Sequence, residues 1–170
     1  MASSSDFRLR ALEPEDLDLL YDVENDTSLW QHSATNVPYS RYLLRQYIAE
    51  AKNDLYADGQ VRLVAEADGH AVGLCDLSNF DPQHQRAEIG LVLFSHCQGH
   101  GYGRLAVSAL EAYARRLMLH QIYAVIADDN LPAARLFEHS GFLPSAHLSD
   151  WIRRPDRFVS VTIWQRIFAE

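Results

Sequence analysis

A glycine-rich stretch between an apolar segment and a helix-like segment most constrains what this chain can fold into. Residues 98–103 read QGHGYG, residues 87–94 before them are mostly apolar, and apolar residues recur at helical spacing after Arg104. A helix N-terminus presents backbone N–H groups without intrahelical partners and a partial positive charge, and glycines let an anion approach that backbone closely. The stretch therefore predicts an anion-binding turn where a strand leads into a helix, with a plain glycine turn as the alternative.

Two other kinds of glycine-rich phosphate site require neighbours that this stretch lacks. A P-loop requires Lys-Ser or Lys-Thr after its last glycine, but Gly103 is followed by Arg104 and Leu105. A dinucleotide-binding fingerprint requires GxGxxG in a parallel βαβ unit, whereas the spacing here is GxGxG and the strands before it are predicted to form an antiparallel meander. Neither site is predicted.

The rest of the chain predicts one mixed α/β domain over residues 1–170. Asp68-Gly69 predicts a tight hairpin, Glu13-Pro14 and Ser40 predict helix starts, and Asn130-Leu131-Pro132 predicts a short helix that ends near Gly141. The predicted fold is a mostly antiparallel sheet of about seven strands flanked by about four helices. The strands are expected at residues 7–12, 61–67, 71–77, 86–94, 122–127, 148–151 and 158–164.

Composition narrows the function. The chain has 15 Lys and Arg against 23 Asp and Glu, a net charge of −8, and no basic stripe, so nucleic acid is not expected as a partner. It has no apolar run long enough to span a membrane and no signal-peptide pattern, and its two cysteines form no disulfide framework, so a cytoplasmic location is expected. His96 and His100 lack a carboxylate cluster, so no metal is expected.

Two motifs carry a family resemblance. Gln98-x-x-Gly101-x-Gly103 resembles the pyrophosphate-binding motif of the GNAT superfamily of acyl-CoA-dependent N-acetyltransferases. The segment 130–142, which begins with Asn130 and ends with Gly141-Phe142, is similar to the strand-to-helix segment along which the pantetheine arm lies in that superfamily. Segments 7–16, 21–26 and 84–90 resemble its branch of spermidine and ribosomal-protein N-terminal acetyltransferases, the last two most closely its spermidine-acetyltransferase-like members.

This resemblance implies acetyl-CoA as the cofactor and a sheet that splays between the strands at 86–94 and 122–127. It implies main-chain contacts from the first of these strands, with a bulge expected at Gly90. The residues implied in cofactor binding are Leu91, Val92, Leu93, Gln98, Gly99, His100, Gly101, Tyr102, Gly103, Arg104, Asn130, Ala133 and Phe137.

Glu88 is the candidate general base. A primary amine with a pKa near ~10.4 is almost fully protonated at neutral pH, so acetyl transfer needs a group that removes its proton. Strand alternation places Ala87 and Ile89 on an apolar face and Glu88 on the other, where a carboxylate is costly unless it is used or paired. An ion pair with Arg86 or another cation is the structural alternative.

The proton donor for the leaving thiolate stays open. Many GNAT enzymes have a Tyr seven residues after the Asn, but this chain has Phe137, which cannot donate a proton. Water, unassisted departure, or one of several nearby groups could take its place: Tyr102, Tyr123, His139 or Ser140. Phe137 also keeps open a non-catalytic acyl-CoA-binding or regulatory module. Cys97 lacks His and Asn partners, so direct transfer is expected rather than an acyl-cysteine.

An acidic segment suggests the acceptor. Residues 13–26 hold seven carboxylates, most of which a solvated helix face explains. By resemblance, Glu24, Asn25 and Asp26 are expected to bind the acceptor, with Trp30 in the wall of the cleft. A polyamine or small amine is expected first, a peptide N-terminus second and an aminoglycoside third, and the oligomeric state stays open, with a homo-oligomer among the options.

Overall fold

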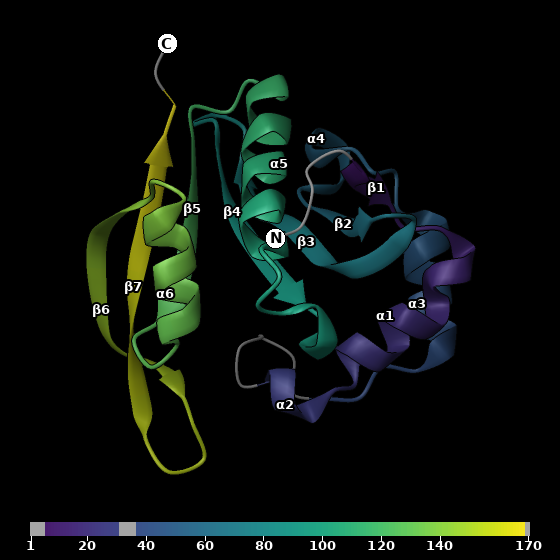
Figure 1. The fold of residues 1–170 in the computed structure, drawn as a ribbon, viewed down its shortest axis with the longest axis horizontal. Helices are drawn as coiled ribbons and strands as arrows, with labels where there is room; N and C mark the ends of the chain where they lie inside the picture. Colours follow the sequence, from purple (N-terminus) through teal and green to yellow (C-terminus); the bar gives the residue numbers. More distant parts are fainter. Residues whose placement is uncertain (1–5, 31–36, 169–170) are drawn as a thin grey trace.

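The computed structural model describes residues 6–30 and 37–168. Within this part of the chain, seven strands form one sheet in the order β1-β2-β3-β4-β5-β7-β6 (Figure 1). The strands are β1 (Phe7–Ala11), β2 (Val61–Ala67), β3 (His70–Asp81), β4 (Arg86–Leu93), β5 (Gln121–Ala127), β6 (Leu143–Arg153) and β7 (Phe158–Ile167). The mixed, mostly antiparallel sheet predicted from the sequence is confirmed.

The sheet separates between β4 and β5, as the resemblance implied. These two strands are parallel and pair only at three positions, from Arg86↔Gln121 to Glu88↔Tyr123. Beyond Glu88, β4 continues its pairing with β3 as far as Leu93, but among the described residues no strand pairs with its other edge. The β4 backbone is therefore open along one edge over its second half.

The helices lie on both faces of the sheet (Figure 1). The described part contains α1 (Leu17–Glu24), α2 (Thr27–Trp30), α3 (Arg41–Glu50), α4 (Leu55–Asp58), α5 (Tyr102–Arg116) and α6 (Leu131–His139), with 3-10 turns at Pro14–Asp16 and Ser95–Cys97. About four helices were expected. The additional ones, α2 and α4, have one turn each, too short for an apolar periodicity to show in the sequence.

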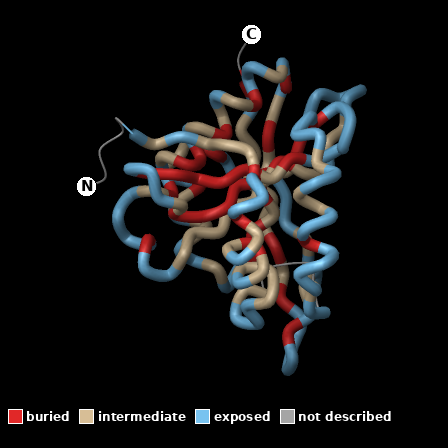
Figure 2. Tube along the Cα trace, turned by 90° about the vertical axis from the view of Figure 1, so that its right-hand side faces the viewer, coloured by how far each residue is buried: buried red, intermediate tan, exposed pale blue. Residues whose placement is uncertain are grey.

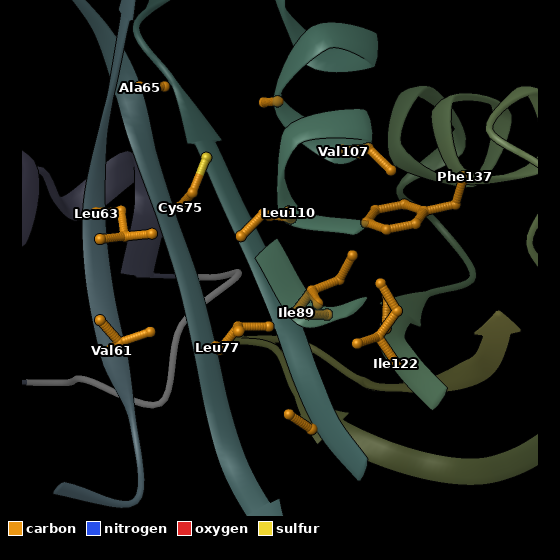
Figure 3. Close-up of a cluster of buried hydrophobic side chains, with 14 of the residues drawn as sticks. Val61, Leu63, Ala65, Cys75, Leu77, Ile89, Val107, Leu110, Ile122 and Phe137 are labelled. Carbon is orange, nitrogen blue, oxygen red and sulfur yellow. The ribbon is translucent and has the colours of Figure 1, made fainter. Parts of the chain in front are cut away.

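Two hydrophobic cores follow from strand alternation. On one face, Leu63, Cys75 and Ile89 pack with Leu110 of α5 and Phe137 of α6 (Figure 3). On the other face, their neighbours in the strands, such as Val64 and Leu74, pack with α1 and α3. Buried positions accordingly run along the central strands, while the helices alternate between buried and exposed (Figure 2).

Two local expectations were wrong. No bulge interrupts β4 at Gly90, which pairs in register with Asp76, and the irregularity instead lies in β3 between Ser78 and Asp81. Strand β6 is longer than the four residues expected, because it pairs with β7 from Leu143 onwards despite register shifts. No described helix is long and apolar enough to cross a membrane.

Candidate active site

A cleft of about 1320 Å³ runs from α1 and α3, past the open edge of β4, to the N-termini of α5 and α6. It brings together twelve of the residues predicted from the sequence. These are Glu24, Trp30, Leu91, Val92, Leu93, Gln98, Gly99, Gly101, Gly103, Arg104, Asn130 and Ala133. The other predicted residues, Asn25, Asp26, Glu88, His100, Tyr102 and Phe137, are not part of its lining.

The N-terminus of α5 is open to an anion. Gly101 is the N-cap residue with φ of 89°, in the left-handed region that favours glycine, and no side chain caps the helix. The unpaired N–H groups of the first turn therefore face the cleft without a competing side chain. Arg104, exposed on the same turn, adds a positive charge at this end of the cleft.

Position 103 requires glycine for a different structural reason. A Cβ atom there would lie 3.1 Å from Cδ2 of Leu136, so the missing side chain lets α5 pack closely against α6. Since both residues line the cleft, this contact also sets the spacing of its walls. The glycine pattern in the sequence thus combines a helix cap with a helix-packing position.

Gln98 and Asn130 both bond to the backbone. The Gln98 side-chain amide donates at 3.2 Å to the carbonyl oxygen of Leu93, the last residue of β4. The Asn130 side chain accepts from the Ala133 N–H at 3.3 Å and caps α6. These two residues shape the backbone on either side of the gap between β4 and β5.

Phe137 lies in the hydrophobic core. Its side chain is buried and meets Phe142 edge-on, with ring centroids 5.0 Å apart. Figure 3 shows its ring pointing towards Val107 and Ile122. Its neighbour Leu136, rather than Phe137, lines the cleft.

Glu88 lies at the point where the sheet opens. It is the last β4 residue that pairs with β5, opposite Tyr123, and its carboxylate accepts a 2.7 Å hydrogen bond from the Asn79 side chain. Its neighbours Ser78 on β3 and Gly90 on β4 line the cleft. A bridging water could connect Glu88 with a group bound there.

The candidate proton donors differ in the contacts that their side chains already make. The Ser140 hydroxyl donates to the Leu136 carbonyl oxygen at 2.8 Å, and His139 Nδ1 lies 2.6 Å from the Arg135 carbonyl oxygen. Tyr123 is beside Glu88, and burial followed by the Glu88 charge raises its pKa above the ordinary value. Tyr123 therefore stays protonated at neutral pH.

The α1/α3 end of the cleft contains two charged residues that sequence reasoning missed, Arg62 and Asp76. The Arg62 guanidinium donates to Asp76 at 2.7 and 3.1 Å and also to Glu24, all three in the cleft lining. Arg62 and Asp76 are cross-strand partners in the β2–β3 hairpin. Their signal in the sequence was two opposite charges in mostly apolar strand segments on either side of Asp68-Gly69, although the first segment also contains Glu66.

The other predicted acceptor residues make local contacts. The Asn25 amide group donates to the carbonyl oxygens of Tyr21 and Tyr39 and accepts from the Tyr39 N–H. Asp26 accepts from Ser28 at the start of α2, and the Trp30 indole donates to the Glu24 carbonyl oxygen at 2.8 Å. Asn25 and Trp30 thus fix the end of α1 relative to the segments that follow.

Among the described residues, no group of three or more His, Cys, Asp or Glu side chains is placed to share a metal ion.

Comparisons with known proteins agree on one family. The family model described as an acetyltransferase (GNAT) domain matches residues 6–143. The chain is 29% identical over 148 residues to spermidine N(1)-acetyltransferase of Vibrio cholerae, covering 85% of this chain and 83% of the relative. It is 27% identical over 143 residues to the Escherichia coli K12 enzyme of the same name, covering 84% and 75%.

Solved structures show the same fold. Spermidine N-acetyltransferase of V. cholerae in complex with CoA and spermine superposes with a TM-score of 0.84 at 26% identity, over 96% of each chain. A dodecameric structure of the V. cholerae enzyme gives 0.80 at 27% identity, over 96% of this chain and 94% of that one. Since the curated relatives are enzymes, a transferase is favoured over a non-catalytic module. The family match over most of the chain shows that it belongs to the GNAT family of acetyl-CoA-dependent amine N-acetyltransferases.

Proposed function

We propose that this chain acetylates the primary amine of a small molecule bound at the α1/α3 end of the cleft. The observation that carries the proposal is the separation of β4 from β5. It joins the uncapped N-terminus of α5 to the end that contains Glu24, Arg62 and Asp76, in one continuous cleft. A cofactor and an acceptor could thus approach the same stretch of β4 from opposite ends.

The residues at the α5 end fit acetyl-CoA. The free N–H groups from Gly101 onwards and the Arg104 guanidinium would hold the pyrophosphate, and the open edge of β4 at Leu91 to Leu93 would hold the pantetheine amides. Asn130 would order the backbone of α6 beside the arm. When bound, acetyl-CoA supplies the acetyl group as an activated thioester.

Two groups would move protons. Glu88 would accept the proton of the acceptor amine through a water, since its carboxylate lies just outside the cleft lining beside Ser78 and Gly90. Tyr123, paired opposite Glu88 and like it outside the described cleft lining, would donate to the leaving thiolate through a water. Phe137, in the core, would support the helix rather than donate.

The experiment is thiol release from acetyl-CoA with a panel of acceptors at one pH. Polyamines come first in the panel because the relatives are spermidine acetyltransferases. Small monoamines, aminoglycosides and a peptide with a free N-terminus complete it. Release with a small amine supports the proposal. Release with the peptide alone would reassign the acceptor, and no release with any acceptor would contradict it.

The oligomeric state is part of the same proposal. One matched V. cholerae structure is dodecameric, so we expect a homo-oligomer here too. Light scattering of the purified chain would show a mass well above 19.3 kDa. A monomeric mass across a range of concentrations would contradict it.

A further inference from the structure

Arg62 holds together the carboxylates at the acceptor end of the cleft. Its Nε and Nη2 atoms donate to the two oxygens of Asp76 at 2.7 and 3.1 Å, a fork-on-fork pair, and its Nη1 donates to Glu24. Only about a quarter of the Arg62 and Asp76 side chains is exposed, and 16% of Glu24. This Glu24–Arg62–Asp76 triad is thus a partly buried part of the cleft wall.

Arg62 keeps its charge in this position. Burial alone would lower the pKa of its guanidinium, but the charges and hydrogen bonds of Asp76 and the charge of Glu24 outweigh that, so its pKa lies above the ordinary value. The triad therefore has two negative charges and one positive charge, a net charge of −1.

The acidic segment adds no further carboxylate to the described lining. Glu24 and Asp76 are the only carboxylates in the described lining of the cleft. Of the other acids in residues 13–26, Asp16 pairs with Arg10, Asp18 pairs with Arg41, and neither lines the cleft. Residues 31–36, outside the described part, contain no Asp or Glu in their sequence.

Apart from the triad, the described wall of this end is uncharged and mostly apolar or aromatic, with Ser28, Gln60 and Ser78 as its polar residues. Leu29, Trp30, Tyr39, Leu43 and Tyr47 line it. The indole N–H of Trp30 is already used by the Glu24 carbonyl oxygen. The phenol of Tyr47 stays neutral because burial raises its pKa. Such a wall favours a hydrocarbon chain or a ring, and it offers a second ammonium group no further carboxylate as a partner.

Asp76 places one carboxylate of the triad close to the open strand. A Cβ atom on Gly90 of β4 would lie 3.6 Å from Asp76 Oδ2, so glycine leaves the carboxylate accessible beside the β4 backbone. An ammonium group next to Asp76 would therefore lie near the strand expected to hold the acetyl group.

We propose that the acceptor is a primary amine with one positive charge on an aliphatic or aromatic body, rather than a polyamine. The inference rests on the proposed function and specifies its substrate class. A second ammonium would lose hydration against the mostly apolar wall, because Arg62 already neutralises in part the two carboxylates of the described lining. The Glu88 carboxylate, outside that lining, is taken up by the reacting amine, whose proton it would accept. The relatives named for spermidine do not decide this, because the charge of the cleft depends on this chain's own side chains.

The test compares substrates that differ by one charge at equal length, hexylamine and hexane-1,6-diamine, with 2-phenylethylamine and spermidine alongside. We expect kcat/KM for hexylamine to exceed that for the diamine by about tenfold or more. A second charge that has no partner in the cleft lowers binding by about this factor, the equivalent of a shift of about one unit in a pKa. Equal values, or a preference for the diamine or spermidine, would overturn the inference. No thiol release with any amine would instead contradict the proposed function.

Variants of the triad give an independent readout. Arg62→Met leaves both carboxylates without their cation, so the ratio of diamine to monoamine kcat/KM should rise by about tenfold, whereas Arg62→Lys should hold the ratio near that of the unaltered enzyme. If Arg62→Met fails to fold, Glu24→Gln tests the same charge argument in the opposite direction and should lower the ratio. An unchanged ratio in folded Arg62→Met, or in Glu24→Gln, would overturn the role of the triad.

Discussion

The side-chain amide of Asn79 donates a 2.7 Å hydrogen bond to the carboxylate of Glu88. Asn79 adopts φ of 48° in the irregular part of β3, and Glu88 is the last β4 residue paired with β5. The irregularity in one strand thus supplies the hydrogen-bond donor that holds the candidate base where the sheet opens.

Glu88→Gln is expected to lower kcat at neutral pH by about a hundredfold, the lower end of the range for general base catalysis, with little change in the KM for acetyl-CoA. The amide keeps the shape of the side chain but cannot take up a proton. Steady-state kinetics in both substrates would measure this. Asn79→Gly is the control, because glycine suits the positive φ and the change removes the hydrogen bond but not the carboxylate. Its kcat should fall far less than that of Glu88→Gln. An unchanged kcat in Glu88→Gln would exclude Glu88 as the base.

Arg104→Gln is expected to raise the KM for acetyl-CoA by about tenfold and leave kcat nearly unchanged, because a hydrogen bond to a charged group contributes about 1.5–3 kcal/mol. The matched control is Arg116→Gln, at the other end of the same helix, where the guanidinium lies over the Tyr113 ring. Equal KM values for the two variants would show that Arg104 does not contact the cofactor.

Gly101→Ala is expected to lower the free energy of unfolding by about 1–2 kcal/mol, since an L-residue with a Cβ atom is strained in the left-handed region. Gly101→Asn should cost less, because Asn tolerates that conformation. Denaturant unfolding would measure both. The strain argument fails if alanine is as stable as glycine at this position.

Phe137→Tyr is expected not to raise kcat, although many family members have Tyr at this position. The ring lies in the core against Phe142, so the new hydroxyl would be buried without a partner and cost about 1–3 kcal/mol of stability. Kinetics and thermal unfolding of the variant would test this. A faster enzyme would mean that the ring edge reaches the cleft after all.

Asp16→Asn is expected to flatten the loss of stability in acid. Hydrogen bonds from Arg10, at 2.7 and 2.9 Å, and then from the Glu13 N–H hold the pKa of Asp16 below its usual value of about 3.9. The unfolded chain therefore takes up a proton first as pH falls. The stabilisation from Asp16 is present above its unfolded pKa and is lost as pH drops through the lower folded value.

Unfolding midpoints from pH 7 down to pH 3 would measure this dependence. The variant should be less stable than the unaltered chain at neutral pH, and the difference should shrink below about pH 4. Asp22→Asn, at an exposed position in α1, is the control. Its unfolding midpoint should change with pH in the same way as that of the unaltered chain. A constant difference between Asp16→Asn and the unaltered chain would contradict the linkage.

The sequence alone determined the strand faces, turns and helix starts, which depend on residues close together in the chain. Alternation in residues 86–94 placed Ala87 and Ile89 in the core and Glu88 on the other face. The glycines at 99–103 placed the turn that starts α5 without a side-chain cap, and Asp68-Gly69 placed the β2–β3 hairpin. In each case the deciding physics acts within a few residues: side-chain period, backbone conformation and free N–H groups.

Tertiary structure decided which distant side chains meet. Glu24 and Arg62 are 38 residues apart in sequence, and only the packing of α1 on β2 and β3 brings them together with Asp76. The same packing leaves most of the carboxylates of residues 13–26 outside the cleft. On the other face of the sheet, the packing of α6 buries Phe137 in the core. Such pairings depend on how helices and strands pack in three dimensions, and no local pattern contains that information. For this reason the sequence identified the cofactor, while the charge available to the acceptor became visible only in the folded chain.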